Sequence, residues 1–70
     1  MKDVEIRQQP IELYKLLKFE GLASSGGEAK MLIADGQVRL NGEVETQKRK
    51  KIVAGDVVEF ASQKLRIRVS

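Results

Sequence analysis

The sequence has no cysteine and no histidine, and these two absences exclude several classes of protein. Without cysteine there can be no disulfide and no thiolate nucleophile, and without both residues the usual zinc ligand sets cannot form. Histidine is also the commonest general acid or base in enzymes. An enzyme built from this chain would therefore have to depend on Asp or Glu, and we expect no metal site, no cofactor and no catalytic residues.

Aromatic residues and long apolar runs are also scarce. Only Tyr14, Phe19 and Phe60 are aromatic among the 70 residues, so a folded core has to be mostly aliphatic. No run approaches the roughly 18 apolar residues of a membrane span, and the first residues lack the apolar stretch of a secretion signal. We expect a single domain over residues 1–70 that is monomeric and cytoplasmic, with no membrane partner.

Positive charge is concentrated in the second half of the chain. Residues 1–36 hold 5 basic and 6 acidic side chains (net −1), whereas residues 37–70 hold 8 basic and 4 acidic ones (net +4). Four cations are consecutive, Lys48–Lys51, and are called the cationic run below. Adjacent cations repel one another, and an anionic partner would relieve that repulsion. A solvated loop is the alternative interpretation, and the run alone leaves both open.

The first third of the chain predicts a strand followed by a helix. Residues 2–7 alternate charged and apolar side chains, which is typical of a half-buried strand. Pro10 suits the first position of a helix, where its missing N–H would have no partner, and Gly21 is typical of a helix end. The leucines expected on the buried side of this helix are Leu13, Leu16 and Leu17.

A second helix is expected between Ser25 and Gly36. Ser25 and Glu28 have the capping-box spacing, in which the serine hydroxyl accepts the glutamate N–H and the carboxylate accepts the serine N–H. Two short helices joined by a few residues favour an αα-hairpin. The residues expected on the buried side are Ala29, Leu32 and Ile33.

After Gly36 the apolar period changes from about 3.6 to about 2 residues, which predicts strands. Asn41 and Gly42 both tolerate a positive φ and predict a hairpin turn, and Ala54–Asp56 predicts a second turn. A last strand is expected over residues 64–69. The residues expected to face inward from it are Leu65, Ile67 and Val69. The predicted fold class is α+β, with a two-helix αα-hairpin packed on a small, mainly antiparallel, mixed β-sheet.

The segment Ser24–Gly27 could present backbone N–H groups to a phosphate, because it opens the second helix and glycine has no obstructing side chain. Ordinary capping beside a flexible connection explains the same residues equally well. The Gly-Lys-Ser/Thr ending of a nucleotide-binding P-loop is missing, so no ATP site is expected. Lys30 lies one turn into the helix, beside the same entrance.

Two other classes of function are compatible with parts of the sequence. Glu43 and Glu45 share one face of an expected strand and, with Asp56, could serve a small hydrolase, although this spacing is common on solvated sheets. The chain could also be a protein-interaction module that docks its cationic run on an acidic partner.

Taken in order, these segments closely resemble one known family. It is the RNA-binding domain named after small-subunit ribosomal protein four, also described as the αL RNA-binding motif. Its recurrent segments correspond here to Gly21–Ser25, Glu28-Ala29 with Leu32-Ile33, Gly36–Gly42 and Ile52–Val58. The resemblance covers about residues 13–60, and the whole chain is similar to stand-alone bacterial members, the YbcJ-like proteins. Each segment is common by itself, but their order and spacing are specific.

The resemblance implies a non-catalytic module that recognises structured RNA through phosphate contacts. The expected partner is ribosomal or transfer RNA, with the ribosome or an RNA-processing protein as a further partner. The residues expected to bind RNA are Lys18, Ser24, Ser25, Gly26, Gly27, Lys30, Arg39, Asn41, Gly42, Lys48, Arg49, Lys50 and Lys51. We expect the second helix start, the Asn41-Gly42 turn and the cationic run to line one concave strip. With so few aromatic residues, recognition by shape is favoured over stacking of single strands.

One position departs from the family pattern. Members usually carry Arg or Lys directly after the serine that opens the second helix, whereas this chain has Gly26 and Gly27. Either the backbone N–H groups of the glycine pair replace the missing contact, or binding depends more on the cationic run.

Overall fold

Two helices and seven strands make up the computed structural model, which describes residues 1–70. The helices are α1 (Leu13–Phe19) and α2 (Gly26–Ala34). The strands are β1 (Lys2–Ile6), β2 (Ile11–Glu12), β3 (Val38–Leu40), β4 (Glu43–Val44), β5 (Lys51–Ile52), β6 (Val57–Phe60) and β7 (Gln63–Val69). The two helices pack on a mixed sheet of five strands, so the predicted α+β class is confirmed.

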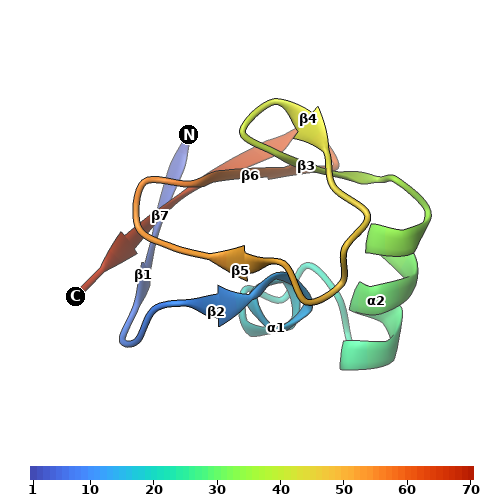
Figure 1. Ribbon diagram of the computed structural model, residues 1–70, viewed down its shortest axis with the longest axis horizontal. Coiled ribbons are helices and arrows are strands. Elements are labelled where there is room, and N and C mark those ends of the chain that lie inside the picture. The colour runs from blue at the N-terminus through green and yellow to red at the C-terminus, as the bar shows by residue number, and fades with distance from the viewer.

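The five-stranded sheet has the order β1-β7-β6-β3-β4. Its only parallel pair is β1 with β7, so the first and last strands of the chain lie side by side (Figure 1). The remaining pairs are antiparallel. Asn41 and Gly42 connect β3 to β4 with φ values of 52° and 88°, which is the positive-φ hairpin turn predicted from their sequence.

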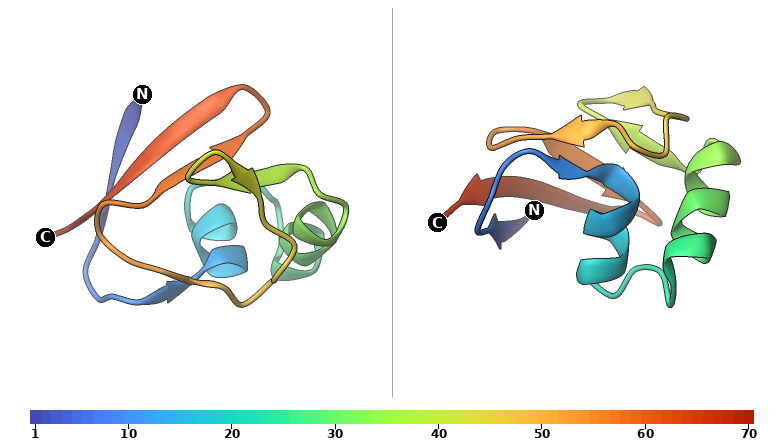
Figure 2. Two further views of the ribbon diagram at one scale, coloured as in Figure 1. Left: turned by 45° about the horizontal axis from the view of Figure 1, so that its top comes forward. Right: turned by 60° about the horizontal axis from the view of Figure 1, so that its bottom comes forward.

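Both helices lie on one side of this sheet, and Figure 2 shows them next to each other. The core between the layers consists of 13 buried residues, all of them aliphatic, as the composition requires. They are Val4, Ile6, Leu13, Leu16, Leu17, Ala23, Ala29, Ile33, Val38, Ile52, Val58, Leu65 and Ile67. No polar side chain is buried with them, so burial of aliphatic surface holds the layers together. Neither helix is long and apolar enough to cross a membrane.

The first helix begins later than predicted. Instead of starting at Pro10, α1 starts at Leu13, because Ile11 and Glu12 pair with Ile52 and Lys51 in a separate two-stranded antiparallel sheet. Ile52 is fully buried, and its pairing with the neighbouring strand keeps Ile11 extended. The competing contact is distant along the chain, so local helix signals around Pro10 could not indicate it.

One prediction of burial was wrong, and another is confirmed only in part. Val69 is 42% exposed although it alternates with Leu65 and Ile67. It lies at the end of β7, away from the two helices that cover the middle of the sheet (Figure 1). Leu32 is only half-buried and packs against the margin of the core.

Candidate functional site

The cationic run is fixed to the start of α1 through its backbone. The Leu13 N–H donates to the carbonyl of Lys50 at 2.9 Å, and the Tyr14 N–H donates to that of Lys48 at 3.1 Å. The first N–H groups of a helix have no partner within it, and the Glu12 side chain does not cap these ones. Carbonyl groups of the run therefore serve as the cap of α1, and all four of its side chains remain exposed to solvent.

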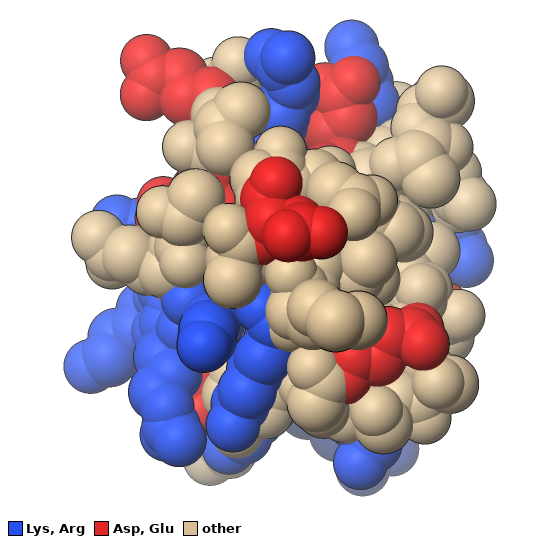
Figure 3. Space-filling view, turned by 90° about the vertical axis from the view of Figure 1, so that its right-hand side faces the viewer, with Lys and Arg blue, Asp and Glu red and all other residues tan.

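Tyr14 is the point at which cations from three segments meet. The ring centroid is 4.6 Å from Lys30 Nζ in α2, 5.7 Å from Arg49 Cζ in the cationic run and 5.9 Å from Lys15 Nζ in α1. These distances are within the range of cation–π attraction. We call Tyr14, Lys15, Lys30 and Arg49 the Tyr14 cluster. Figure 3 views the α2 side of the molecule and shows several Lys and Arg side chains gathered at its lower left.

One carboxylate partly balances the Tyr14 cluster. Glu12 accepts an ion pair from Lys15 at 3.4 Å and another from Arg49 at 3.7 Å. The side chains of Lys15 and Arg49 are 59% and 67% exposed, so water screens both pairs and each contributes little to stability. Lys30 and the three lysines of the cationic run form no ion pair within the chain. The surface therefore keeps an excess of positive charge.

The start of α2 is capped, but with a different pairing from the one expected. Ser25 Oγ accepts the Glu28 N–H at 3.1 Å, as the capping box requires. The Glu28 carboxylate instead accepts from Ser24, whose N–H lies at 3.0 Å and whose hydroxyl lies at 3.2 Å. Ser24 offers two donors to this carboxylate, whereas Ser25 would offer only its N–H. The donors of Ser24 are thus occupied, and a negative charge lies at the helix start.

Gly26 brings this helix start against the Tyr14 ring. A Cβ on Gly26 would lie 3.6 Å from Cε2 of Tyr14, and the N–H groups of Gly26 and Gly27 have no acceptor in the chain. The α2 start and the cationic run, which are distant in sequence, therefore meet at Tyr14. These two segments lie close together, as predicted, although the Glu28 carboxylate lies beside the free N–H groups of Gly26 and Gly27.

The Asn41-Gly42 turn is held by hydrogen bonds inside the protein. Asn41 Oδ1 accepts the Val57 N–H at 2.8 Å, and its Nδ2 donates to Asp56 Oδ1 at 3.2 Å. The other carboxylate oxygen of Asp56 accepts the Val53 N–H at 3.0 Å. Asn41 and Asp56 thus fasten the β3–β4 hairpin to the turn before β6, and the Asn41 side chain has a structural role.

A shallow hollow of about 440 Å³ adjoins this turn. Lys50 and Lys51 line it together with Glu43, Glu45 and Asp56, so we call it the Lys50 hollow. Both oxygens of Asp56 accept hydrogen bonds, and one oxygen of Glu45 accepts the Gln47 N–H at 3.0 Å. The three carboxylates considered for a hydrolase do meet here, but two of them hold turns in place.

Two predicted residues remain, and they lie in different places. Lys18 is exposed on α1 one turn after Tyr14, so these two side chains share a face of the helix. Arg39 alternates with the buried Val38 and therefore points away from the helices. Its Nη1 donates to the Gly42 carbonyl at 3.4 Å, and the structure does not bring it to the Tyr14 cluster.

Sequence reasoning missed Tyr14 and Lys15. Neither residue is among those expected from the sequence to bind RNA. The spacing of Tyr14 and Lys18 indicated a shared helix face, but the approach of Lys30 and Arg49 depends on tertiary packing.

The sequence of the chain is similar to those of known proteins. The model of the S4 domain family matches residues 4–68. The "Putative RNA-binding protein YbcJ" of Escherichia coli is 53% identical over 57 residues, which are 81% of this chain and 81% of that protein. The "Probable ribosome maturation protein RlbA" of Bacillus subtilis is 34% identical over 57 residues, 81% of this chain and 80% of that protein.

Solved structures share the fold. The solution structure of E. coli YbcJ, described as revealing an αL motif involved in RNA binding, matches with a TM-score of 0.72 and 46% identity. That match covers 100% of this chain and 89% of YbcJ. Ribosomal protein S4e of Thermoplasma acidophilum matches with a TM-score of 0.70 over 86% of this chain and 32% of S4e. Its identity is 23%, so this likeness shows the fold alone.

Proposed function

Because the chain belongs to the S4 domain family, we propose that all of it acts as one non-catalytic domain that binds structured RNA. The observation that supports this most is the Tyr14 cluster, in which cations from α1, α2 and the cationic run surround one ring. Glu12 is the only carboxylate paired with these cations. A polyanion laid across them would gain from all three segments at once.

The proposed contacts are with phosphates. Lys side chains act as point charges, and the free N–H groups of Gly26 and Gly27 suit anionic oxygens. Contacts of this kind position a nucleic acid without reading its bases. Double-helical RNA is recognised mostly by shape and by its backbone, which fits a surface where Tyr14 is the single aromatic residue and is already covered by cations.

We further propose that the RNA is ribosomal, with transfer RNA as the second candidate, and that a monomer binds it in the cytoplasm. Support comes from the B. subtilis relative, which is named as a probable ribosome maturation protein. The ribosome or a factor that processes its RNA is then the expected further partner.

Two triple variants with the same loss of charge test the proposal. One replaces Lys48, Arg49 and Lys50 by Gln, and the other replaces Lys64, Arg66 and Arg68 on the outer face of β7. Affinity for an RNA hairpin should fall by about 10- to 100-fold in the first variant, because three phosphate contacts are lost. It should fall less than about threefold in the second, because Arg66 and Arg68 already pair with Asp3 at 3.3 and 3.5 Å.

Equal losses in the two variants would show that only net charge matters and would contradict the proposed surface. The alternative of an acidic protein partner is favoured instead if the wild-type protein binds polyglutamate more tightly than the hairpin. Backbone chemical shifts on RNA titration provide a second readout. They should move at Tyr14, at residues 24–30 and within the cationic run, and only weakly at Arg39, which points away from the helices.

A further inference from the structure

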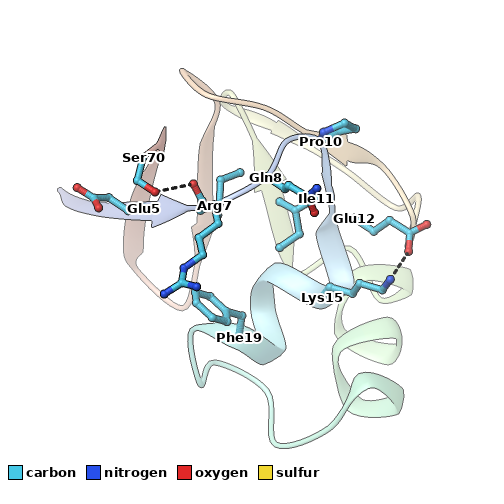
Figure 4. Close-up of a pocket in the computed structure, with 10 residues that line it drawn as sticks. Glu5, Arg7, Gln8, Pro10, Ile11, Glu12, Lys15, Phe19 and Ser70 are labelled. Atoms are coloured by element: carbon cyan, nitrogen blue, oxygen red, sulfur yellow. Dashed lines mark hydrogen bonds and ion pairs between the residues drawn. The ribbon is translucent and has the colours of Figure 1, made fainter.

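A second hollow of about 680 Å³ lies between the end of β1, β2 and α1 (Figure 4). Phe19 lines it, and this residue is 66% exposed although the chain has only three aromatic residues. Figure 4 shows Arg7 and Phe19 toward one end of this hollow and the Glu12–Lys15 ion pair toward the other. We call it the Phe19 hollow.

The lining combines a few apolar side chains with polar groups of both kinds. Ile11 adds a second apolar side chain, Pro10 lies toward the opposite end from Phe19 (Figure 4), and Arg7 and Gln8 add hydrogen-bond donors. Glu5, Glu12 and Ser70 add acceptors. An unpaired nucleotide can use Phe19 for stacking, the polar groups for hydrogen bonds to its base edge, and Arg7 or Lys15 for its anionic phosphate.

The Phe19 hollow is continuous with the proposed phosphate-binding surface. Lys15 lines the hollow and also belongs to the Tyr14 cluster, and Glu12 lines the hollow and pairs with Arg49. Helical geometry explains this continuity: around the exposed side of α1, the side chains follow one another in the order Tyr14, Lys18, Lys15, Phe19. Lys18 and Lys15 therefore lie between Tyr14 and Phe19 on the surface of α1.

We propose that the Phe19 hollow holds one unpaired nucleotide of the bound RNA, with its base stacked on Phe19 and its phosphate beside Lys15 or Arg7. This inference rests on the proposed function and deepens it. The cationic run binds backbone phosphates of any sequence, whereas the hollow contacts a base and selects RNA whose helical stem carries an unpaired residue.

The test measures the affinity for a fully paired RNA stem and for a series of variants of that stem. Each variant carries one single-nucleotide bulge, placed at a different position along the stem. Phe19→Ala should weaken binding of the best bulged stem by about 5- to 100-fold, the effect expected for losing one base–aromatic stack, and leave the paired stem unchanged. Phe19→Leu, which keeps an apolar side chain without a ring, should lose most of the same affinity. Met31→Ala is the matched control, because Met31 is 60% exposed on α2 and does not line the hollow.

Ring-proton shifts of Phe19 give a second measurement, and they should move upfield with the bulged stem only. The inference is overturned, while the proposed function stands, if wild type binds both stems and Phe19→Ala affects both equally or neither. If wild type binds no RNA at all, the proposed function and this inference fail together. Phe19 signals that respond to an added peptide and to neither RNA would also overturn it.

Discussion

Tyr14 shows how one half-buried side chain can organise a charged surface. Its edge packs against Gly26, while Lys15, Lys30 and Arg49 lie within 6 Å of its ring centroid. Attraction between a cation and the ring face offsets part of the repulsion among the three cations. The ring therefore helps to hold positive charges from distant parts of the chain near one another, with Glu12 as the only acidic side chain paired with them.

Glu28 opposes anion binding at the start of α2, so its neutralisation should strengthen RNA binding. Glu28→Gln keeps an oxygen that can accept from Ser24 but removes the negative charge beside the free N–H groups of Gly26 and Gly27. We expect affinity for an RNA hairpin to rise about two- to fivefold. Stability should fall by about 0.3–1 kcal/mol, because the charge no longer interacts with the helix dipole.

Asp35→Asn is the control for this variant, because it removes the same charge at the other end of α2. Affinity should rise less than about twofold there. An equal rise in both variants would mean that Glu28 is not near the bound phosphate. Titration of each variant with the hairpin at one salt concentration is sufficient for the comparison.

At the scale of elements, the cationic run is part of the scaffold through its backbone and part of the candidate site through its side chains. The carbonyls of Lys48 and Lys50 cap α1, and Ile52, which directly follows the cationic run, is buried. Within residues 48–52, the four charged side chains are thus exposed to solvent while the fifth side chain packs in the core. We expect these backbone contacts to persist when the side chains are replaced, because main-chain carbonyls supply them.

Changing Lys48, Arg49, Lys50 and Lys51 together to Gln should therefore leave the melting temperature equal or slightly higher, because like-charge repulsion is removed. Ile52→Ala in the same segment should instead cost about 2–5 kcal/mol, since a fully buried side chain is truncated. Thermal or denaturant unfolding measures both. Unfolding of the Gln variant would show that the lysine and arginine side chains are themselves structural.

Most elements were predictable because their signals are local. Ser25 with Glu28 marked the start of α2, and Asn41-Gly42 marked the β3–β4 turn. The β2–β5 pair was missed because it joins residues about forty apart, and no local pattern around Ile11 reports such a contact. The β6–β7 turn lacked a signal as well, since Ala61 and Ser62 adopt φ values of 50° and 67° without glycine or asparagine.

The candidate site was predictable in part for the same reason. The cationic run and the start of α2 were identified from composition and spacing, and the structure brings them together at Tyr14. The identification of Asn41 and Arg39 as RNA contacts did not anticipate that one is engaged in internal hydrogen bonds and the other points away. The direction of a side chain and its internal hydrogen bonds depend on how the sheet assembles. The local order of residues in the sequence does not indicate this.

At the scale of the whole molecule, the two faces of the sheet differ in how their charges are balanced. On the outer face, Asp3 pairs with Arg66 and Arg68, and Lys64 lies opposite Glu59. On the helix side, the lysines of the cationic run and Lys30 form no ion pair. The net charge of +3 therefore understates how positive the electrostatic potential is near the cationic run and Lys30.

This asymmetry predicts a steep salt dependence of RNA binding. If the surface neutralises about 4 to 6 phosphates, the slope of log affinity against log salt concentration should be about −3 to −5. Titrations with one hairpin at several potassium chloride concentrations measure it. A slope near zero would contradict phosphate contacts, and an unchanged slope after the Lys48, Arg49 and Lys50 triple substitution would place those contacts elsewhere.

The carbonyl cap on α1 has a consequence for how such a domain can change over generations. A peptide carbonyl is the same whichever amino acid supplies it, so mutations among residues 48–51 alter what the surface attracts without weakening the helix that they support. Selection can then adjust ligand preference by single codon changes, while folding stays constant. Diversification of ligands is thereby uncoupled from the risk of misfolding.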